Sequence, residues 1–215
     1  MNHYFTDNRH LAQNRKEITF RFSCFTCHFL TDNGVFCKDH VDFGTRTLLD
    51  AVHASGLLGE EVLDLGCGYG VIGITLKKQY PDSAFTLAEV NPRALELAQE
   101  NAARNGAEVT CVCSDVYSGV EGNTFTDILT NPPIRAGKKV IYQMFEQAYD
   151  HLREGGRLWV VIRKQQGAAS AREKIAQVFG SCEIISREKG YLVLLAKKVL
   201  TLRENVTYCE KVNKQ

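Results

Sequence analysis

The stretch Asp64-Leu-Gly-Cys-Gly-Tyr-Gly70 decides the fold of this 215-residue chain. It overlaps the end of Glu60–Leu65, an apolar segment that predicts a strand, and it precedes Val71–Tyr80, which predicts a helix ended by Pro81. Its glycines allow the backbone to approach a ligand where a Cβ atom would intrude. A strand that passes through a glycine-rich turn into a helix is the place where open α/β sheets bind nucleotide-type ligands.

The segments that follow continue the alternation of strand and helix. Strands are predicted at Ala84–Val90, Glu108–Cys113, Phe125–Thr130 and Leu158–Ile162, and helices at Lys139–Leu152 and Ala169–Phe179. Two further strands, Cys182–Arg187 and Tyr191–Ala196, flank a tight turn and predict an antiparallel hairpin. This order is typical of an α/β protein with a mostly parallel sheet that ends in an antiparallel hairpin.

The helix predicted after the strand Ala84–Val90 has the clearest boundaries in the chain. Asn91 is placed to cap it, Pro92 occupies its first position, and Gly106 follows its end. Its expected apolar stripe is Leu95, Ala98 and Ala102, with Glu100 and Arg104 paired on the outer face. We therefore expect this helix to pack one face against the sheet.

Residues 1–50 differ from the rest in pattern. Glu17–Phe22 and Phe25–Leu30 alternate with period two and predict a small β-hairpin, and Thr45–Ser55 predicts a helix that leads into the main unit. We expect an N-terminal β-hairpin extension over residues 1–50, a ligand-binding domain over 51–197 and a polar tail over 198–215.

Composition excludes several classes of protein. Hydrophobic residues make up 44% and charged residues 24%, the balance of a soluble globular chain, and the net charge is +1. No apolar run reaches the roughly 20 residues of a membrane helix, and the first residues lack a signal peptide's pattern, so we expect a cytoplasmic protein. Without such a signal, the eight cysteines are expected to be reduced thiols. Cys24-Phe-Thr-Cys27, with His28 and Cys37 nearby, leaves zinc as an alternative, but we expect no metal.

Three acidic side chains, Asp64, Glu89 and Asp115, fall at the ends of three successive predicted strands. Gly68-Tyr-Gly-Val-Ile-Gly73 fits the GxGxxG dinucleotide pattern, but Asp64 would then place a carboxylate against two phosphate charges. S-adenosylmethionine has no phosphate and carries a sulfonium and an ammonium group. Glu89 is placed to accept both ribose hydroxyls, and Asp115 to accept from the adenine amino group. The alternative is that Asp64 and Asp115 only cap turns.

With Asn131-Pro-Pro-Ile134 after the fourth strand, these residues resemble the class I S-adenosylmethionine-dependent methyltransferases. The likeness is closer to single-domain relatives of the small-subunit ribosomal RNA guanine-N2 methyltransferases. It is carried by Gly34–Thr45, Thr130–Lys139 and Leu158–Lys164, and it covers roughly residues 30–197.

The resemblance implies a Rossmann-like fold with a seven-stranded sheet, and it places the cofactor along a defined set of residues. Phe36 and the Gly44-Thr45 turn are expected to help wall its pocket. Glu89 stands where the family usually has Asp, and its longer side chain should still reach the ribose. The expected cofactor-binding residues are Phe36, Gly44, Thr45, Asp64, Gly66, Cys67, Gly68, Gly70, Glu89, Val90, Asp115, Val116 and Asn131.

The segment Asn131-Pro-Pro-Ile134 supplies the expected catalytic residues, Asn131, Pro132, Pro133 and Ile134. An exocyclic amine on a base is a poor nucleophile because its lone pair is delocalised into the ring. The Asn131 side-chain oxygen and the Pro132 carbonyl can accept its N–H hydrogens and direct the lone pair at the methyl group. Pro132 and Pro133 restrict φ and lack N–H donors, so the loop is rigid. Catalysis is then mostly positioning for in-line transfer, without a strong general base.

Related loops carry an aromatic residue after the prolines that stacks on a flipped base. Ile134 offers only an apolar face, so we expect Phe36 or Tyr142 to stack instead. The expected substrate-binding residues are basic and lie near the same edge of the sheet: Arg135, Lys138, Lys139, Arg163 and Lys164. A solvated rim is the alternative for these five.

We therefore expect an enzyme that methylates the exocyclic N2 of a guanine in ribosomal RNA of the 16S type, with RNA or the small ribosomal subunit as partner. One alternative keeps the chemistry but takes adenine N6 or a protein glutamine amide as the acceptor. Another is a non-catalytic RNA-binding module with a vestigial cofactor pocket; intact Asp64, Glu89, Asp115 and Asn131 argue against it.

Overall fold

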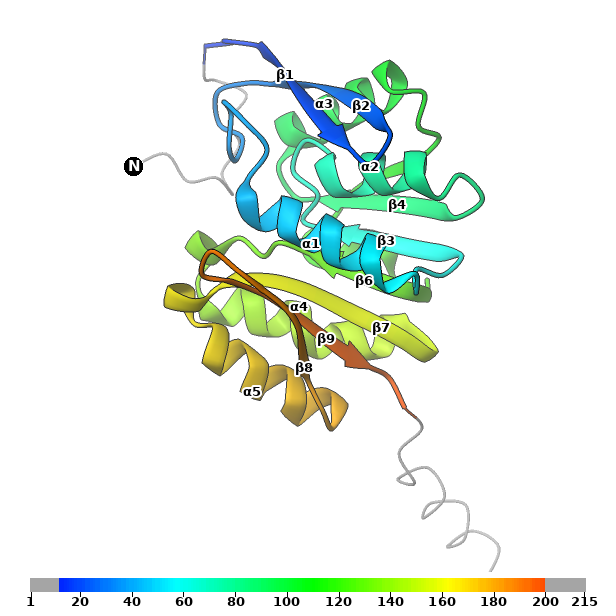
Figure 1. Cartoon of the computed structure of the whole chain (residues 1–215), viewed down its shortest axis with the longest axis vertical. Helices are drawn as coiled ribbons and strands as arrows, with labels where there is room; N and C mark the ends of the chain where they lie inside the picture. The colour runs from blue at the N-terminus through cyan, green and yellow to red at the C-terminus, as the bar shows by residue number, and fades with distance from the viewer. Residues whose placement is uncertain (1–11, 200–215) are drawn as a thin grey trace, which may run out of the picture.

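One sheet of seven strands divides the molecule (Figure 1), and the computed structural model describes residues 12–199. The strands are β3 (Glu61–Leu65), β4 (Ala84–Glu89), β5 (Thr110–Cys113), β6 (Phe125–Thr130), β7 (Leu152–Arg163), β8 (Glu183–Glu188) and β9 (Tyr191–Lys197). They lie in the order β5-β4-β3-β6-β7-β9-β8. All pairs from β5 to β7 are parallel, whereas β9 pairs antiparallel with both β7 and β8. The predicted Rossmann-like α/β fold with an antiparallel last hairpin is confirmed.

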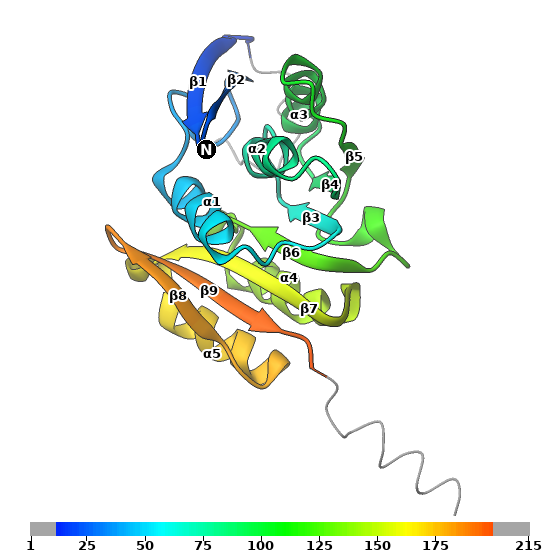
Figure 2. The same ribbon diagram turned by 45° about the vertical axis from the view of Figure 1, so that its right-hand side comes forward.

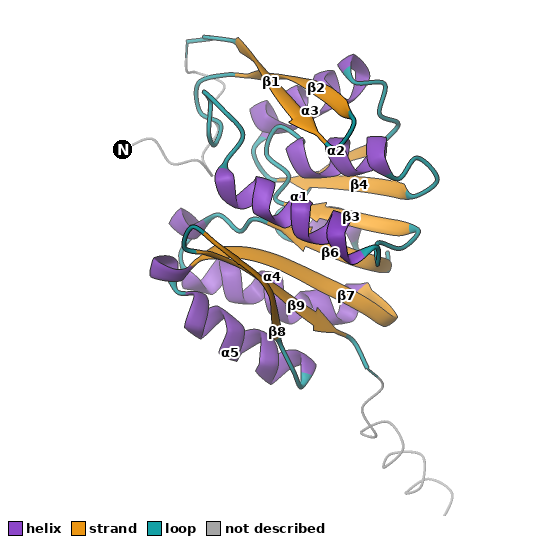
Figure 3. Ribbon diagram, viewed as in Figure 1, coloured by secondary structure: helices purple, strands orange, loops and turns teal. Residues whose placement is uncertain are grey.

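Five helices cover the two faces of this sheet (Figures 2 and 3). On one face lie α1 (Phe43–Ser55), α2 (Val71–Gln79) and α3 (Pro92–Arg104), and on the other α4 (Lys138–His151) and α5 (Ala168–Phe179). Strand β7 shows how the sheet serves both layers. Its Trp159 and Val161 belong to the core under α1 to α3, whereas Val160 belongs to the core under α4 and α5. Successive side chains of a strand point to opposite faces, so an unbroken apolar run fills two cores.

Helix α3 begins and ends where the sequence predicts. The side chain of Asn91 accepts hydrogen bonds from Arg93 N (3.1 Å) and Ala94 N (3.4 Å), and Gly106, just past the end, has a φ of +61°. The predicted apolar stripe of this helix is buried. The predicted pair between Glu100 and Arg104 is wrong, because each pairs with the N-terminal segment instead: Arg15 with Glu100, and Glu17 with Arg104.

The predicted N-terminal hairpin is present as β1 (Lys16–Phe22) and β2 (Phe25–Thr31), which pair antiparallel. It docks on α3 through side-chain amides that pair with the β2 backbone. Asn101 accepts from Leu30 N (2.6 Å) and donates to Leu30 O (3.0 Å), and Asn105 forms the same two bonds with His28. These amides satisfy backbone groups at a strand edge that would otherwise be unpaired.

One strand begins well before its predicted start. Strand β7 begins at Leu152, not at Leu158, because Leu152 pairs with Phe125 and the backbone of Gly155 and Gly156 bonds to Lys198. The glycine pair therefore lies within an irregular strand and does not close α4.

Within residues 12–199, no helix is long and apolar enough to span a membrane, and no cluster of His, Cys, Asp and Glu side chains is arranged to hold a metal ion. Cys24 lies in the turn between β1 and β2, and Cys27 is buried in β2. The predicted tail, 198–215, lies outside the described residues except for its first two positions.

Candidate active site

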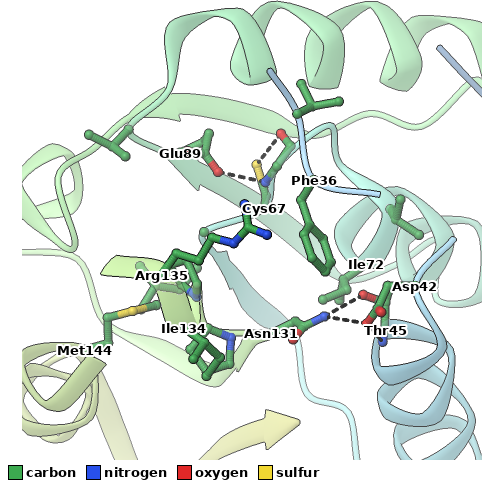
Figure 4. Close-up of a pocket in the computed structure, with 18 of the residues that line it drawn as sticks. Phe36, Asp42, Thr45, Cys67, Ile72, Glu89, Asn131, Ile134, Arg135 and Met144 are labelled. Atoms are coloured by element: carbon green, nitrogen blue, oxygen red, sulfur yellow. Dashed lines mark hydrogen bonds between the residues drawn. The ribbon is translucent and has the colours of Figure 1, made fainter. Parts of the chain in front are cut away.

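A cavity of about 550 Å³ opens at the carboxyl ends of the parallel strands, where the chain leaves β3, β4 and β6 (Figure 4). This is the position at which open α/β sheets bind ligands, and the volume suits a nucleoside-sized molecule. Its lining residues are Val35, Phe36, Cys37, Asp42, Thr45, Leu65, Gly66, Cys67, Gly68, Tyr69, Val71, Ile72, Glu89, Val90, Ser114, Asp115, Val116, Asn131, Pro132, Pro133, Ile134, Arg135, Val140, Met144, Gln166 and Tyr191.

The glycines of the loop after β3 have separate functions. Gly66 lines the cavity with φ +73°, and a Cβ atom there would meet only Met144, at 3.9 Å, so it would project into open space. Gly70 does not line the cavity, contrary to expectation. A Cβ atom on Gly70 would stand 2.6 Å from Ile74 and 3.3 Å from Ala98, so this glycine lets α2 pack closely on α3.

Glu89 is buried at the end of β4 and lines the cavity. One carboxylate oxygen accepts from Gly68 N (2.8 Å) and the other from Asn91 N (2.9 Å). The side chain therefore braces the glycine loop against the start of α3. Each carboxylate oxygen can accept more than one hydrogen bond, so Glu89 can hold the loop and a ligand hydroxyl at once.

Asp64 lies below the cavity rather than on its wall. It is fully buried, and its Oδ2 accepts from Gly73 N (2.8 Å), while its Oδ1 has no hydrogen-bond partner within residues 12–199. Burial raises the pKa of Asp64 to about 7, and the nearby Glu89 carboxylate adds to the rise. Asp64 thus supports the first turn of α2, just after the glycine loop, and is not among the residues that line the cavity.

The turn after β5 forms another part of the wall. Asp115 and Val116 line the cavity, and Val116 has a φ of +55°, which is rare for a β-branched residue. Its carbonyl accepts from Ser114 Oγ (2.8 Å), which itself accepts from Gly119 N (2.9 Å). These bonds hold a strained turn that presents Asp115 to the cavity.

The amide of Asn131 is held from one side. Its Nδ2 donates to Asp42 Oδ2 (3.1 Å) and to Thr45 Oγ1 (3.0 Å), two residues at the start of α1 (Figure 4). The Oδ1 atom, on the other branch of the planar amide, accepts no hydrogen bond from residues 12–199. Within the same residues, the carbonyl of Pro132 is likewise without a donor. Two acceptors are therefore available at the cavity wall.

Apolar groups flank these acceptors. Ile134 and Phe36 both line the cavity, and the Phe36 ring, 52% exposed, points into it (Figure 4). Tyr142, the other candidate for stacking, does not line the cavity; it lies under Lys174, whose Nζ is 5.7 Å from its ring. Of the two predicted candidates, only Phe36 is in a position to stack on a planar acceptor.

The other predicted residues divide between wall and rim. Gly44 lies inside the first turn of α1 and not in a turn on the cavity wall. Of the five predicted basic residues, only Arg135 lines the cavity. The other four are exposed: Lys138 and Lys139 at the start of α4, Arg163 at the end of β7 and Lys164 just after it. Because β6 and β7 run parallel, their ends bring these residues to the edge where Asn131-Pro-Pro-Ile134 lies.

Sequence reasoning missed two important residues of the wall. Asp42 could have been found, because an acidic residue three positions before Thr45 fits a helix cap. Tyr191 had no such signal, since it reaches the cavity only because β9 starts at the same edge where β7 ends.

The charges of the cavity wall distinguish between the two ligands considered from the sequence, a dinucleotide and S-adenosylmethionine. The described lining contains three carboxylates, Asp42, Glu89 and Asp115, and one cation, Arg135. This excess of negative charge suits a ligand with a sulfonium and an ammonium group and opposes a pyrophosphate. Together with the open space beside Gly66, the residues present fit S-adenosylmethionine.

Comparison with known proteins agrees with this reading. Residues 26–195 match the family described as methyltransferase small domain. The "Uncharacterized protein YbxB" of Bacillus subtilis (strain 168) is 43% identical over 199 residues, which cover 92% of this chain and 98% of that protein. Ribosomal RNA small subunit methyltransferase C of Actinobacillus pleuropneumoniae serotype 3 (strain JL03) is 35% identical over 167 residues, covering 76% of this chain and 50% of that protein.

Among solved structures, the T. thermophilus 16S rRNA N2 G1207 methyltransferase in complex with AdoMet and guanosine superposes with a TM-score of 0.78. It is 25% identical, and the match covers 86% of this chain and 50% of that one. The chain thus spans about half the length of the ribosomal RNA methyltransferases it matches.

Proposed function

The chain belongs to the methyltransferase small domain family of S-adenosylmethionine-dependent methyltransferases, and from this premise we propose that it methylates the exocyclic N2 of a guanine in ribosomal RNA. The observation that carries the proposal is the pair of free acceptors, Asn131 Oδ1 and the Pro132 carbonyl, beside the cavity. An exocyclic amine has two N–H groups to fill them. The relatives that act on ribosomal RNA, one of them bound to guanosine, support guanine as the acceptor.

The residues of the chain act mainly by placing the acceptor nitrogen. S-adenosylmethionine supplies a methyl group activated by its sulfonium. Asn131 and Pro132 accept the amine hydrogens, which concentrates the lone pair on the nitrogen and aims it into the cavity. Pro132 and Pro133 keep this loop rigid. The nitrogen becomes acidic as the new bond forms, so its proton leaves to solvent without a strong base.

Phe36 and Ile134 complete the acceptor site. Phe36 is well placed to stack on the flipped base, and Ile134 supplies the apolar surface beside it. Arg135, on the cavity wall, and the four exposed basic residues are proposed to contact phosphates of the RNA. In this arrangement the negative wall holds the cofactor and the positive rim holds the substrate.

The test is methyl transfer from labelled S-adenosylmethionine to ribosomal RNA and small subunits taken from a strain that lacks the gene. The proposal expects N2-methylguanosine at one position, found by nuclease digestion and mass spectrometry. Label in N6-methyladenosine or in protein glutamine would replace guanine by one of the alternative acceptors. Cofactor binding without transfer to any of these would favour a binding module.

A further inference from the structure

The side-chain amide of Asn131 has two orientations of similar shape, which exchange its nitrogen and oxygen. In one, the side chain offers an acceptor to the substrate amine; in the other, it offers N–H donors that oppose the amine hydrogens. Only the first supports the chemistry proposed for this site. What decides the orientation is therefore part of the mechanism.

Asp42 is the contact that distinguishes the two orientations. Its Oδ2 lies 3.1 Å from Asn131 Nδ2. An ionised carboxylate accepts hydrogen bonds but cannot donate, so the contact is favourable with the amide nitrogen and repulsive with the amide oxygen. Thr45, whose Oγ1 is 3.0 Å from the same nitrogen, can accept or donate and so tolerates both orientations.

From this geometry, and resting on the proposed function, we infer that Asp42 is a positioning residue: it fixes the amide orientation of Asn131 so that Oδ1 faces the acceptor amine. Asp42 reaches Asn131 across 89 positions of sequence, from the start of α1 to the end of β6. It acts through Asn131 and not on the methyl group.

Asp42 is itself held in place. Its Oδ2 caps α1 by accepting from Thr45 N (3.1 Å), and its Oδ1 accepts from the Cys37 thiol at 3.9 Å. Burial raises the pKa of Cys37 to about 11, and the Asp42 carboxylate adds to this, so the thiol keeps the proton that it donates. Both carboxylate oxygens are therefore anchored, which makes Asp42 a rigid reference for the amide.

The same region explains Gly44. A Cβ atom at this position would stand 2.8 Å from Asp42 Oδ2 and 2.7 Å from the ring of Tyr191. Any side chain here would displace the carboxylate or the ring. Gly44 therefore serves the cavity indirectly, by letting Asp42 and Tyr191 come together in its wall.

A plain helix cap is the competing role for Asp42, and a conservative variant separates the two. Asn caps helices as well as Asp does, so Asp42→Asn keeps the cap. Its neutral amide can also donate, so it no longer excludes the flipped orientation of Asn131. We expect Asp42→Asn to lower kcat about tenfold, the effect of weakening one charge-assisted hydrogen bond, with Tm close to wild type and a smaller loss of cofactor affinity, because one wall carboxylate becomes neutral.

A double-mutant cycle tests whether this loss passes through Asn131. In an Asn131→Ala background, Asp42→Asn should have no further effect on kcat, because there is no amide left to orient. The same tenfold loss in both backgrounds, or an unchanged kcat in the single variant, would overturn the inference. Thr45→Val, which keeps the backbone N–H cap and removes the hydroxyl, should lower kcat less than Asp42→Asn.

A second measurement does not depend on the substrate. In wild type, ¹⁵N NMR should show the Asn131 side-chain amide with one proton shifted downfield by the carboxylate, and Asp42→Asn should move this signal toward the free position. An unaltered signal would disprove the orienting contact even if transfer occurs. If wild type shows this signal but transfers no methyl group to ribosomal RNA, the substrate proposal fails while the contact stands.

Discussion

The two walls of the cavity are built in different ways. The glycine wall, Gly66–Ile72 with Glu89, takes its bonds from nearby sequence: Glu89 to Gly68 spans 21 positions. The NPPI wall, Asn131–Arg135 with Asp42 and Thr45, is joined across 89 and 86 positions. On the glycine wall, the Glu89 carboxylate accepts hydrogen bonds from two backbone N–H groups. On the NPPI wall, Asn131 Oδ1 and the Pro132 carbonyl accept none from residues 12–199.

This difference teaches that one wall uses its polar side chain to hold the protein's own backbone, whereas the other presents the acceptors on which the proposed chemistry depends. Glu89 holds the glycine loop by accepting from Gly68 N, and Asp64 holds the first turn of α2 by accepting from Gly73 N. Within residues 12–199, Asn131 is held only through its nitrogen, so its oxygen is available to a substrate. Variants in the two walls should therefore fail in different measurements.

The largest effect is expected on the NPPI wall. Asn131→Ala removes an acceptor that positions the amine, and loss of one preorganised hydrogen bond typically lowers kcat by about 10²–10³. Affinity for S-adenosylmethionine, measured by calorimetry, should stay within a few-fold of wild type. A variant that loses cofactor binding instead would show that the loop has a structural role, and the distinction between the two walls would then fail.

On the glycine wall, Glu89→Ala should weaken cofactor binding without this selective loss of kcat. It removes the brace to Gly68 and an acceptor for a hydroxyl, and a hydrogen bond to a charged group contributes about 1.5–3 kcal/mol, or ten- to hundredfold in Kd. Asp115→Asn is the control, since this exposed side chain makes no hydrogen bond to the described part of the chain and the variant still offers an oxygen. Equal losses in both variants would show that the brace is unimportant.

The buried carboxyl of Asp64, beneath the glycine wall, should make the stability of the fold depend on pH. The pKa of Asp64 is about 7 in the folded state and lies above the value for the unfolded chain, so the folded protein binds this proton more tightly. The stability that protonated Asp64 contributes is therefore lost as pH rises from about 4 through 7. Asp64→Asn lacks this titration. The difference in free energy of unfolding between Asp64→Asn and wild type should shift in favour of the variant by about 2 kcal/mol from pH 5 to pH 7, roughly thirtyfold in the unfolding constant. Denaturant curves at several pH values measure it; parallel pH profiles would contradict the prediction.

The smallest effect is expected at the rim beside the NPPI wall. If Lys138 and Lys139 contact RNA phosphates, replacing both by Gln should flatten the salt dependence of RNA binding by about 0.7 of a slope unit for each contact, roughly sevenfold between 50 and 200 mM salt. Lys197 is the matched control, because β9 runs antiparallel and places it at the opposite edge of the sheet. An unchanged slope in the double variant would leave these lysines as a solvated rim.

The sequence predicted what depends on local order. Helix α3 was located to the residue, because Asn91, Pro92 and Gly106 act on the backbone next to them. The start of β7 was missed, because Leu152 joins the sheet by pairing with Phe125 and not through any preference of its own segment. The outward pair of Glu100 and Arg104 was wrong for the same reason: their partners, Arg15 and Glu17, come from the N-terminal segment.

The sequence by itself determined the α/β class, the position of the glycine loop and of Asn131-Pro-Pro-Ile134 at the ends of strands, and the cofactor that the family shares. Each of these features follows from residues only a few positions apart, because such short spacings fix the local geometry of the backbone. Only the tertiary structure decided that Asp64 is buried beneath the cavity, that Gly44 makes room for Tyr191, and that Asp42 holds Asn131. These contacts join α1, β6 and β9, and the folding of the sheet, not the spacing of any motif, brings their ends to one edge.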